Sequence, residues 1–238
     1  MRLECHVHTK YSIDSFQFHW LLYIMCRIKK INYIAITEHN RIDGAKAFDQ
    51  YCRRHGGKVK VIVGEEIMTA EGEIIGLFID ELVKPFLSVE ETIMEIKKQN
   101  GIVYIPHPYD LKRERTVLKE SAIKKYSNLF DAIEIHNGRN ASKEYDGKQM
   151  ALSKKYNIMP IVGSDAHTFF EIGRNYLVMP DVDVTVDNFK IELQKATFVC
   201  SECLYVAHYV TKLVKGIKKI KQGEFYELYR LVFRKIKE

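Results

Sequence analysis

The chain alternates between short apolar runs and helix-like stretches over most of its length, and this alternation restricts the possible folds more than any other feature. The apolar runs have the length of buried strands and cover Leu3–His6, Tyr33–Thr37, Val59–Gly64, Ile102–Pro106, Ala132–His136 and Met159–Gly163. The helix-like stretches between them are Phe16–Lys30, Gly44–His55, Ser88–Gln99, Thr116–Ser127 and Ser142–Tyr156. Strands that alternate with helices are typical of a parallel α/β fold.

Two local signals refine this pattern. Ser88 and Glu91 have the spacing of a capping box, which predicts the start of a helix at this point. Ile74–Ile79 resembles a further strand, and a turn at Glu71-Gly72 would join it to Glu65–Ala70.

The length of 238 residues suits one enzyme-sized α/β domain, either a barrel or an open sheet. We expect this domain to cover residues 1–204, with a basic helical extension over residues 205–238 that packs on it. The formal net charge of +6 comes mainly from that extension, which contains Lys212, Lys215, Lys218, Lys219, Lys221, Arg230, Arg234, Lys235 and Lys237. A solvated helix face explains such a segment most simply, and contact with nucleic acid is the alternative.

The five cysteines are odd in number and irregularly spaced, which favours reduced thiols and a cytoplasmic protein. Cys200 and Cys203 form a single C-x-x-C pair, which is weak evidence for zinc or redox chemistry without a second pair. The first residues contain no apolar signal-peptide core. The apolar stretch Trp20–Cys26 is too short to span a bilayer, so no membrane partner is expected.

Short clusters of histidine and acidic residues stand at the carboxyl ends of the predicted strands. They are Cys5-His6-Val7-His8 with Asp14, Glu38-His39-Asn40, Gly64-Glu65-Glu66, Pro106-His107-Pro108, Glu134-Ile135-His136-Asn137 and Gly163-Ser164-Asp165-Ala166-His167. In parallel α/β folds this edge carries the active site, because loops from many strands meet there. Neutral imidazole and carboxylate groups bind divalent metals, so the clusters predict a hydrolytic metal centre.

The ordered motifs resemble those of the PHP (polymerase and histidinol phosphatase) superfamily. The resemblance runs from about Met1 to about Val199 and rests on His6-Val7-His8 with Asp14, Thr37-Glu38-His39-Asn40, Gly64-Glu65, Pro106-His107-Pro108 and Gly163-Ser164-Asp165-Ala166-His167. It implies an α/β fold of the distorted (β/α)7 barrel type, with a cluster of two or three metals at its carboxyl edge. It also implies metal-dependent hydrolysis of phosphate esters.

The resemblance also implies a set of metal ligands. One metal would take His6, His8, Glu65 and Asp165, and a second would take Asp14, His39 and His167. Glu65 would bridge the first metal to a third, which would also take His107. On an extended segment, residues two apart face the same way, so His6 and His8 can reach one ion, and so can Asp165 and His167.

Two positions depart from the family pattern or lie outside it. Glu73 stands where many members have a histidine that completes the third site. A carboxylate there would favour harder ions such as Mn²⁺, although a solvent-facing turn residue is the alternative. His136 is not required by the pattern, and we expect it beside the ligands or facing substrate, or hydrogen-bonded at the barrel rim.

Two or three divalent ions, Zn²⁺, Mn²⁺ or Fe²⁺, would supply a bridging hydroxide as the nucleophile, so no catalytic side chain is expected. Arg174, close after the last ligands, resembles a family arginine that approaches the phosphate. Arg41 and Arg139 each follow a cluster and are weaker candidates.

These features predict a phosphoesterase acting on a phosphorylated small metabolite or nucleotide. A 5′ to 3′ exonuclease on short RNA or DNA is the first alternative, in which the basic extension would grip the backbone. Its aromatics are spaced as one helix face, which a packed amphipathic helix also explains: Phe225, Tyr226, Tyr229 and Phe233. A metal-binding module without catalysis is the second alternative, and the sequence does not indicate an oligomeric state.

Overall fold

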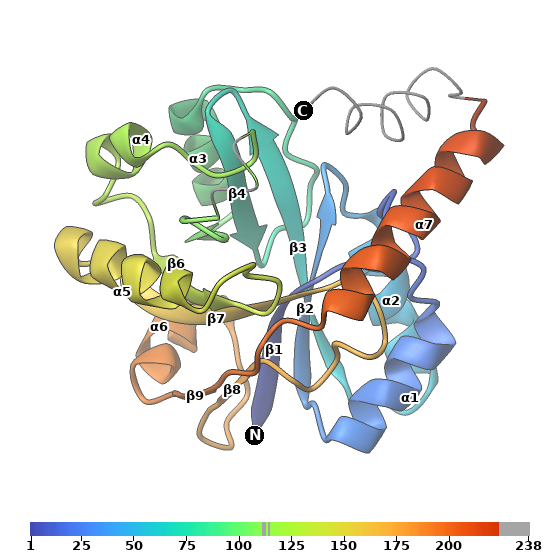
Figure 1. Cartoon of the computed structure of the whole chain (residues 1–238). Coiled ribbons are helices and arrows are strands. Elements are labelled where there is room, and N and C mark those ends of the chain that lie inside the picture. Colours follow the sequence, from blue (N-terminus) through green and yellow to red (C-terminus); the bar gives the residue numbers. More distant parts are fainter. Residues whose placement is uncertain (111–112, 114, 224–238) are drawn as a thin grey trace.

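In the computed structural model, which describes residues 1–110, 113 and 115–223, seven strands pair edge to edge in a closed ring (Figure 1). The ring closes because β1 pairs with β2 on one side and with β7 on the other. Its strands are β1 (Arg2–Val7), β2 (Tyr33–His39), β3 (Lys60–Thr69), β4 (Gly72–Leu77), β5 (Ile102–Ile105), β6 (Ala132–Asn137) and β7 (Met159–Ala166). The predicted distorted barrel with a C-terminal helix is therefore confirmed.

One strand distorts the barrel. β4 runs antiparallel to both β3 and β5, whereas the other pairings in the ring are parallel. β3 and β4 form a hairpin whose turn is Ala70 and Glu71, one residue before the Glu71-Gly72 turn that the sequence predicted. Thr69 Oγ1 accepts a hydrogen bond from Glu71 N and donates one to Gly72 O, which fixes this turn.

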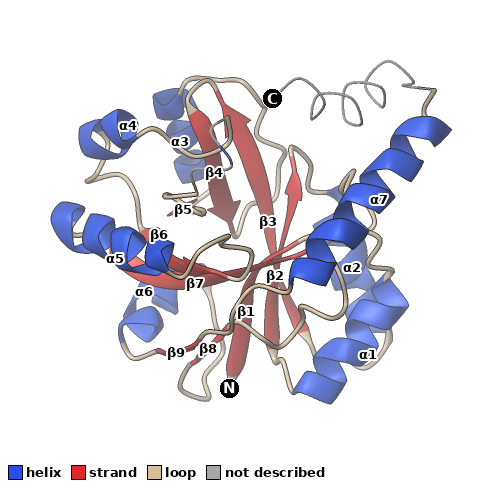
Figure 2. Cartoon of the chain, viewed as in Figure 1, coloured by secondary structure: helices blue, strands red, loops and turns tan. Residues whose placement is uncertain are grey.

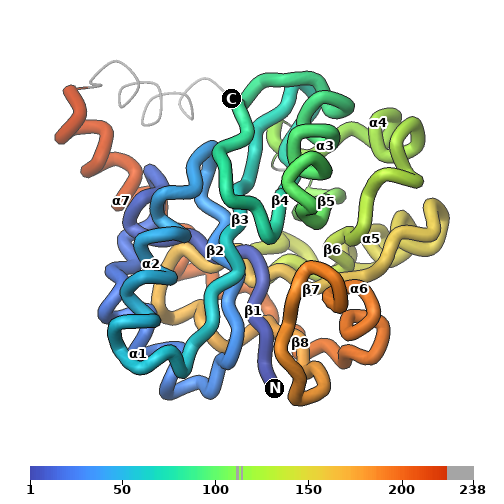
Figure 3. The backbone as a smooth tube through the Cα atoms, turned by 180° about the vertical axis from the view of Figure 1, so that it is seen from behind, coloured from blue at the N-terminus to red at the C-terminus, as the bar shows by residue number. Residues whose placement is uncertain are grey.

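Helices cover the outside of the ring (Figure 2). They are α1 (His19–Lys29), α2 (Asp43–Arg54), α3 (Val89–Lys98), α4 (Glu120–Lys125), α5 (Glu144–Tyr156), α6 (Val186–Gln194) and α7 (Tyr205–Lys221). Seen from behind, α1 and α2 lie together on one side, and α3 and α4 lie on the other (Figure 3). The capping box predicted at Ser88 and Glu91 is present at the start of α3.

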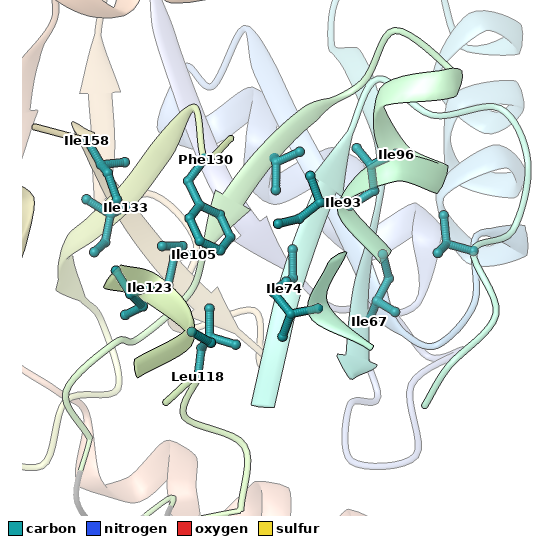
Figure 4. Packing of buried hydrophobic residues seen from close by; sticks show 14 of the residues in the cluster. Ile67, Ile74, Ile93, Ile96, Ile105, Leu118, Ile123, Phe130, Ile133 and Ile158 are labelled. Atoms are coloured by element: carbon teal, nitrogen blue, oxygen red, sulfur yellow. The ribbon is translucent and has the colours of Figure 1, made fainter. Parts of the chain in front are cut away.

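The largest apolar cluster lies between the strands and α3, α4 and α5 (Figure 4). Ile93 and Ile96 of α3 pack there against Ile74 of β4 and Ile105 of β5, and all four are fully buried. This packing explains why the helical spacing in residues 88–99 was visible in the sequence, since one face of α3 is buried and the other is solvated.

The amino-terminal end of the barrel is closed by α6, which the sequence pattern did not predict. Phe189 and Leu193 of α6 join a buried cluster with Leu3, Tyr33 and Ile102, which lie at the beginnings of their strands. Two short strands outside the ring, β8 (Tyr176–Val178) and β9 (Thr197–Val199), flank α6 and extend the sheet from β1. They are three residues long, too short to show an alternating pattern.

The C-terminal extension begins as the helix α7 at Tyr205, beside the predicted boundary at residue 204. Whether this boundary separates two units stays a prediction. The aromatic residues Phe225, Tyr226, Tyr229 and Phe233 lie outside the described residues. Among the helices that the structure describes, none has both the length and the apolar character needed to cross a bilayer.

Candidate metal centre

Histidine and carboxylate side chains from distant parts of the chain meet at the carboxyl end of the barrel. They form four overlapping groups, and within each group the potential ligand atoms lie within 4.8 Å of one another. The groups are His8 with His39 and His167, His6 with Glu66 and His107, His6 with His8 and Asp165, and His39 with Glu66 and Glu73. The predicted convergence of sequence-distant clusters is thus observed.

His6, His107 and Asp165 have positive φ angles of 64°, 29° and 51°. Such backbone conformations are uncommon for residues other than glycine and tend to occur at functional sites. The pairing of β1 with both β2 and β7 shifts its register around His6. A bulge of this kind redirects side chains, so simple strand alternation is not what brings His6 and His8 together.

His6 and His8 both point at Asp165. The Nε2 atom of each histidine lies 3.6 Å from Asp165 Oδ1. These three atoms are buried and have no hydrogen-bond partner in the described part of the chain. A buried polar atom without a partner is costly, and a divalent cation among these atoms would satisfy all three.

The Nδ1 atoms of the same histidines have partners of their own. His6 Nδ1 lies 2.8 Å from Glu134 Oε1, and His8 Nδ1 lies 3.1 Å from Ser12 Oγ. His167 Nδ1 lies 2.8 Å from the backbone oxygen of Asp165. When Nδ1 carries the proton and donates it to such a partner, Nε2 keeps a free lone pair for a metal.

Asp14 lies on the other side of the cluster. Its Oδ1 is 3.3 Å from His167 Nε2 and 3.5 Å from His39 Nε2. Burial opposes a charge on Asp14, but the two histidines hold the pKa of its carboxyl well below the usual value. The predicted association of Asp14, His39 and His167 is therefore present in the geometry.

The loop that carries Asp14 is fixed by hydrogen bonds to the ends of two strands. Ser15 Oγ donates to the backbone oxygens of His8 and His167, each at 2.9 Å. Glu38 accepts a hydrogen bond from Thr9 N at 2.9 Å and others from the hydroxyls of Thr9 and Ser12. Glu38 therefore organises the loop rather than joining the cluster.

The structure places Glu66, and not Glu65, in the cluster. Glu66 Oε2 lies 2.8 Å from His39 Nδ1, and Glu66 Oε1 lies 3.0 Å from His107 Nε2. Glu65 instead accepts a hydrogen bond from Val83 N at 3.0 Å, and burial raises its pKa to about 7. Consecutive residues of a strand face opposite sides of the sheet. Glu66 therefore faces the cluster, and Glu65, the carboxylate expected there, lies on the other face of β3.

Glu73 faces the cluster from β4. This orientation is the one expected of a metal ligand, and it differs from that of the solvent-facing turn residue that was the alternative. Its carboxylate is 3.4 Å from His107 Nε2 and 3.9 Å from His39 Nδ1, and the residue is buried. Burial and the neighbouring Glu66 raise the pKa of Glu73 to about 7. In Glu66 burial acts in the same direction, but His6 and His39 outweigh it and hold the pKa well below the usual value.

Glu134 is a functional candidate that the sequence reasoning missed. Besides His6 Nδ1, its carboxylate contacts the Tyr104 hydroxyl and accepts from Asn137 Nδ2 at 2.8 Å and His107 N at 2.5 Å. It therefore orients two candidate ligands at once. A signal for it is present in the sequence, because Glu134 belongs to the same cluster as His136.

His136 points away from the cluster. Its ring nitrogens lie 2.8 Å from Asp146 Oδ2 and 3.1 Å from Asn175 Oδ1. It lines a cavity of about 390 Å³ together with residues such as Asn140, Lys143 and Tyr205. Of the alternatives that we expected for His136, a histidine hydrogen-bonded at the barrel rim agrees best with these contacts.

The predicted phosphate contact, Arg174, is not brought to the cluster. Its guanidinium donates to the backbone oxygen of Glu202 at 3.1 Å in an exposed position. Arg113 is the arginine that reaches the cluster, because its Nη2 donates to Asp165 Oδ2 at 2.6 Å and its Nε lies 3.0 Å from Asp110 Oδ2. No motif around Arg113 marked it in the sequence.

The two weaker arginine candidates are engaged elsewhere. Arg41 binds Asp43 through two nitrogens and the backbone oxygen of Tyr11 through a third. Arg139 donates to Thr211 Oγ1 at 2.9 Å and lies 3.4 Å from Glu171.

Comparison with known proteins agrees with this geometry. The sequence model of the family described as PHP domain matches residues 4–172. MJ0417, an uncharacterized protein of Methanocaldococcus jannaschii, is 31% identical over 186 residues, which are 77% of this chain and 73% of the relative.

Two solved structures share the fold at low identity. A two-domain protein from Bacteroides vulgatus, described as containing a predicted PHP-like metal-dependent phosphoesterase, superposes with a TM-score of 0.64 at 17% identity. The match covers 84% of this chain but only 64% of that protein. An amidohydrolase from Chromobacterium violaceum, solved with bound sulfate and no metal, superposes with a TM-score of 0.57 at 16% identity. This match covers 70% of this chain and 88% of the amidohydrolase.

Proposed function

Because the chain belongs to the PHP domain family, we propose that it is a metal-dependent phosphoesterase that hydrolyses a phosphate ester of a small metabolite or nucleotide. The observation that carries this proposal is the orientation of the histidines. His6 and His8 have partners at Nδ1, and their buried Nε2 atoms make no hydrogen bond to any residue that the structure describes but face the carboxylates of Glu66, at 3.2 and 3.4 Å, and of Asp165, at 3.6 Å. Such a donor set suits a cation better than it suits a hydrogen-bonded core.

We assign the ligands by the groups in which they lie and, for Asp14, by its contacts with His39 and His167. His6, His8 and Asp165 would hold one ion, and Asp14, His39 and His167 would hold a second. Glu66 belongs to two of the groups, so it takes the bridging role first given to Glu65. His107 and Glu73 would complete a third position, where an added carboxylate favours a harder ion such as Mn²⁺ over Zn²⁺.

Bound divalent ions would lower the pKa of a water molecule and neutralise charge on phosphoryl oxygens. The chain's own groups prepare this chemistry. Glu134 holds the proton of His6 at Nδ1, and it fixes the backbone of His107. Arg113 contacts Asp165 through Nη2 and Asp110 through Nε, so it holds the Asp165 carboxylate in place and adds positive charge beside the centre.

The cavity beside the centre supports a small leaving group. It is about 390 Å³ in volume, within the range of small-molecule pockets, and most of the residues that line it have polar side chains. Asn137 connects it to the cluster, because Asn137 lines the cavity and donates to Glu134. A nucleoside or sugar would fit this lining better than an apolar group would.

The experiment is a screen of phosphate monoesters, nucleotides and short oligonucleotides with added Mn²⁺, in which His8→Ala is the blank. Turnover of a monoester by the wild type and not by the blank supports the proposal. Equal turnover by both proteins would show that the activity does not come from this centre. Bound metal without any turnover would favour the non-catalytic module.

The exonuclease is retained as a second candidate because the basic helix α7 lies beside the centre, with Lys215 3.8 Å from Asp14. An activity on oligonucleotides that falls steeply with added salt, while monoester hydrolysis does not, would favour it.

We also propose a reducing, cytoplasmic location, since all five cysteines are free thiols.

A further inference from the structure

The helix α7 places polar side chains against the barrel and leaves much of its apolar surface exposed, unlike an ordinary amphipathic helix. Its apolar residues Val206, Tyr209, Leu213 and Ile217 are between 44% and 72% exposed, and Ala207 is its one fully buried residue. A helix that only stabilised the fold would bury the apolar stripe. The side chains that α7 places against the barrel therefore need another explanation.

Two sets of contacts fix α7 to loops on either side of the metal centre. Near its start, Thr211 Oγ1 accepts from Arg139 at 2.9 Å, and His208 Nε2 lies 3.0 Å from Cys203 Sγ. Near its end, Lys218 Nζ donates to the backbone oxygens of Lys10, Ser12 and Ser15 at 2.5 to 2.8 Å. Those three contacts use all the protons of the ammonium group, so Lys218 is an anchor.

Lys215 lies between these anchors on the same face of the helix, because residues three and four apart are neighbours on a helix surface. Its Nζ is 3.8 Å from Asp14 Oδ2, while Asp14 Oδ1 faces His39 and His167. The side chain is 37% exposed. An ion pair this long and this exposed contributes little to stability, and the ammonium can turn to another anion at little cost.

Arg113 and Lys215 stand beside different candidate ligands. Arg113 contacts Asp165, and Lys215 approaches Asp14. A phosphate ester has three non-bridging oxygens, so the positive charge of Arg113 can act on it from one side while the Lys215 ammonium donates to it from another.

We propose that Lys215 binds the phosphate group of the substrate, and that α7 is thereby a wall of the active site. This inference rests on the proposed function, since it concerns the same centre. The polar face of α7, made of His208, Thr211, Lys215 and Lys218, closes the side of the centre next to Asp14. Figure 1 shows α7 starting near β2 and running outward in front of α2.

The test compares Lys215→Ala with Lys221→Ala, which removes the same charge from an exposed position on the same helix. Full-length proteins are loaded with Mn²⁺ and titrated with inorganic phosphate by calorimetry, and KM is measured on the best monoester. Loss of one charge-assisted hydrogen bond predicts that Kd and KM rise about tenfold for Lys215→Ala. We expect changes below about twofold for Lys221→Ala and partial recovery for Lys215→Arg.

Bound Mn²⁺ is measured in each variant. Unchanged phosphate affinity in Lys215→Ala would overturn the inference, and so would a loss of Mn²⁺, because the lysine would then act through Asp14. A wild type that binds phosphate through Lys215 but hydrolyses no ester would refute the proposed function alone. If Lys215→Ala fails to fold, Lys215→Gln is measured in its place.

Discussion

The two ends of the barrel are built from the same strands but contain opposite kinds of side chain. At the amino-terminal end, Leu3 and Tyr33 pack with Phe189 of α6 in an apolar cluster. At the carboxyl-terminal end, the same two strands, β1 and β2, contribute His6 and His39 to a cluster of histidines and acids. One end can therefore be assigned to stability and the other to function, as in other α/β barrels.

The difference lies in what burial costs at each end. Burying apolar surface is favourable without any partner, so the amino-terminal end stabilises the fold by itself. Buried charges are costly unless other charges compensate them, so the carboxyl-terminal end depends on the balance among its histidines, its acids and a bound cation. Substitutions at the two ends should therefore separate activity from stability.

The largest expected effect comes from Glu66→Gln. Loss of the proposed bridging carboxylate should lower kcat/KM by roughly a thousandfold, which corresponds to about 4 kcal/mol, and should reduce the Mn²⁺ bound per chain. Steady-state kinetics on the best ester and metal analysis measure both effects.

Glu65→Gln is the matched control, because it makes the same change one residue away on the other face of β3. It should keep kcat/KM within about threefold of the wild type. A severe loss in Glu65→Gln together with normal activity in Glu66→Gln would return the bridging role to Glu65.

Phe189→Ala should have the next largest effect, on stability. It removes a fully buried ring from the amino-terminal cluster, so the free energy of unfolding should fall by about 3 kcal/mol. The kcat of the folded protein should stay unchanged. Denaturant unfolding and kinetics at low temperature test the two statements.

Ile191→Ala on the same helix is the control, since Ile191 is 55% exposed. Its unfolding free energy should change by less than about 1 kcal/mol. A loss of kcat in Phe189→Ala at full metal content would show that the two ends are coupled.

Glu4 gives a smaller effect that depends on pH. Burial raises the pKa of Glu4 to about 8, because its contacts, such as a hydrogen bond from Gly173 N, offset the burial only in part. The folded state then holds a proton that the unfolded state releases above its ordinary pKa of 4.5. Stability from this group should therefore fall as pH rises from about 5 to about 8, by roughly 3 kcal/mol relative to Glu4→Gln.

Unfolding of the wild type and of Glu4→Gln at several pH values checks this sign. A difference between the two proteins that does not change with pH would mean that Glu4 is ionised in the folded state. The comparison also shows what the metal centre adds, because in Glu66 and Asp165 nearby cationic groups reverse the effect of burial on the pKa.

The sequence allowed the barrel and the place of the centre to be predicted, because both depend on local patterns. Strand-like runs that end at His6, or just before His39 and Asp165, place these side chains at one edge of any parallel sheet. The choice between Glu65 and Glu66 could not be made in this way. It depends on which face of β3 turns inward, and that is set by pairing with β2, where His39 lies opposite Glu66.

The arginine was missed for a related reason. Arg174 follows the last ligands closely in the sequence, but the chain there leads toward β8 and turns Arg174 to Glu202. Arg113 reaches Asp165 across 52 positions of the chain. Contacts of that kind arise from tertiary structure, and neither spacing nor periodicity reports them.

The closure of the ring by β1 has a consequence for how the protein is made. β1 pairs through Cys5 with Gly163 of β7, so its second neighbour is synthesised long after β1 itself. A nascent chain cannot close the barrel, or bring Asp165 to His6 and His8, until residue 167 has left the ribosome. Proteins grow from the amino terminus, so the centre is assembled late in synthesis and can take up its ions only after that point.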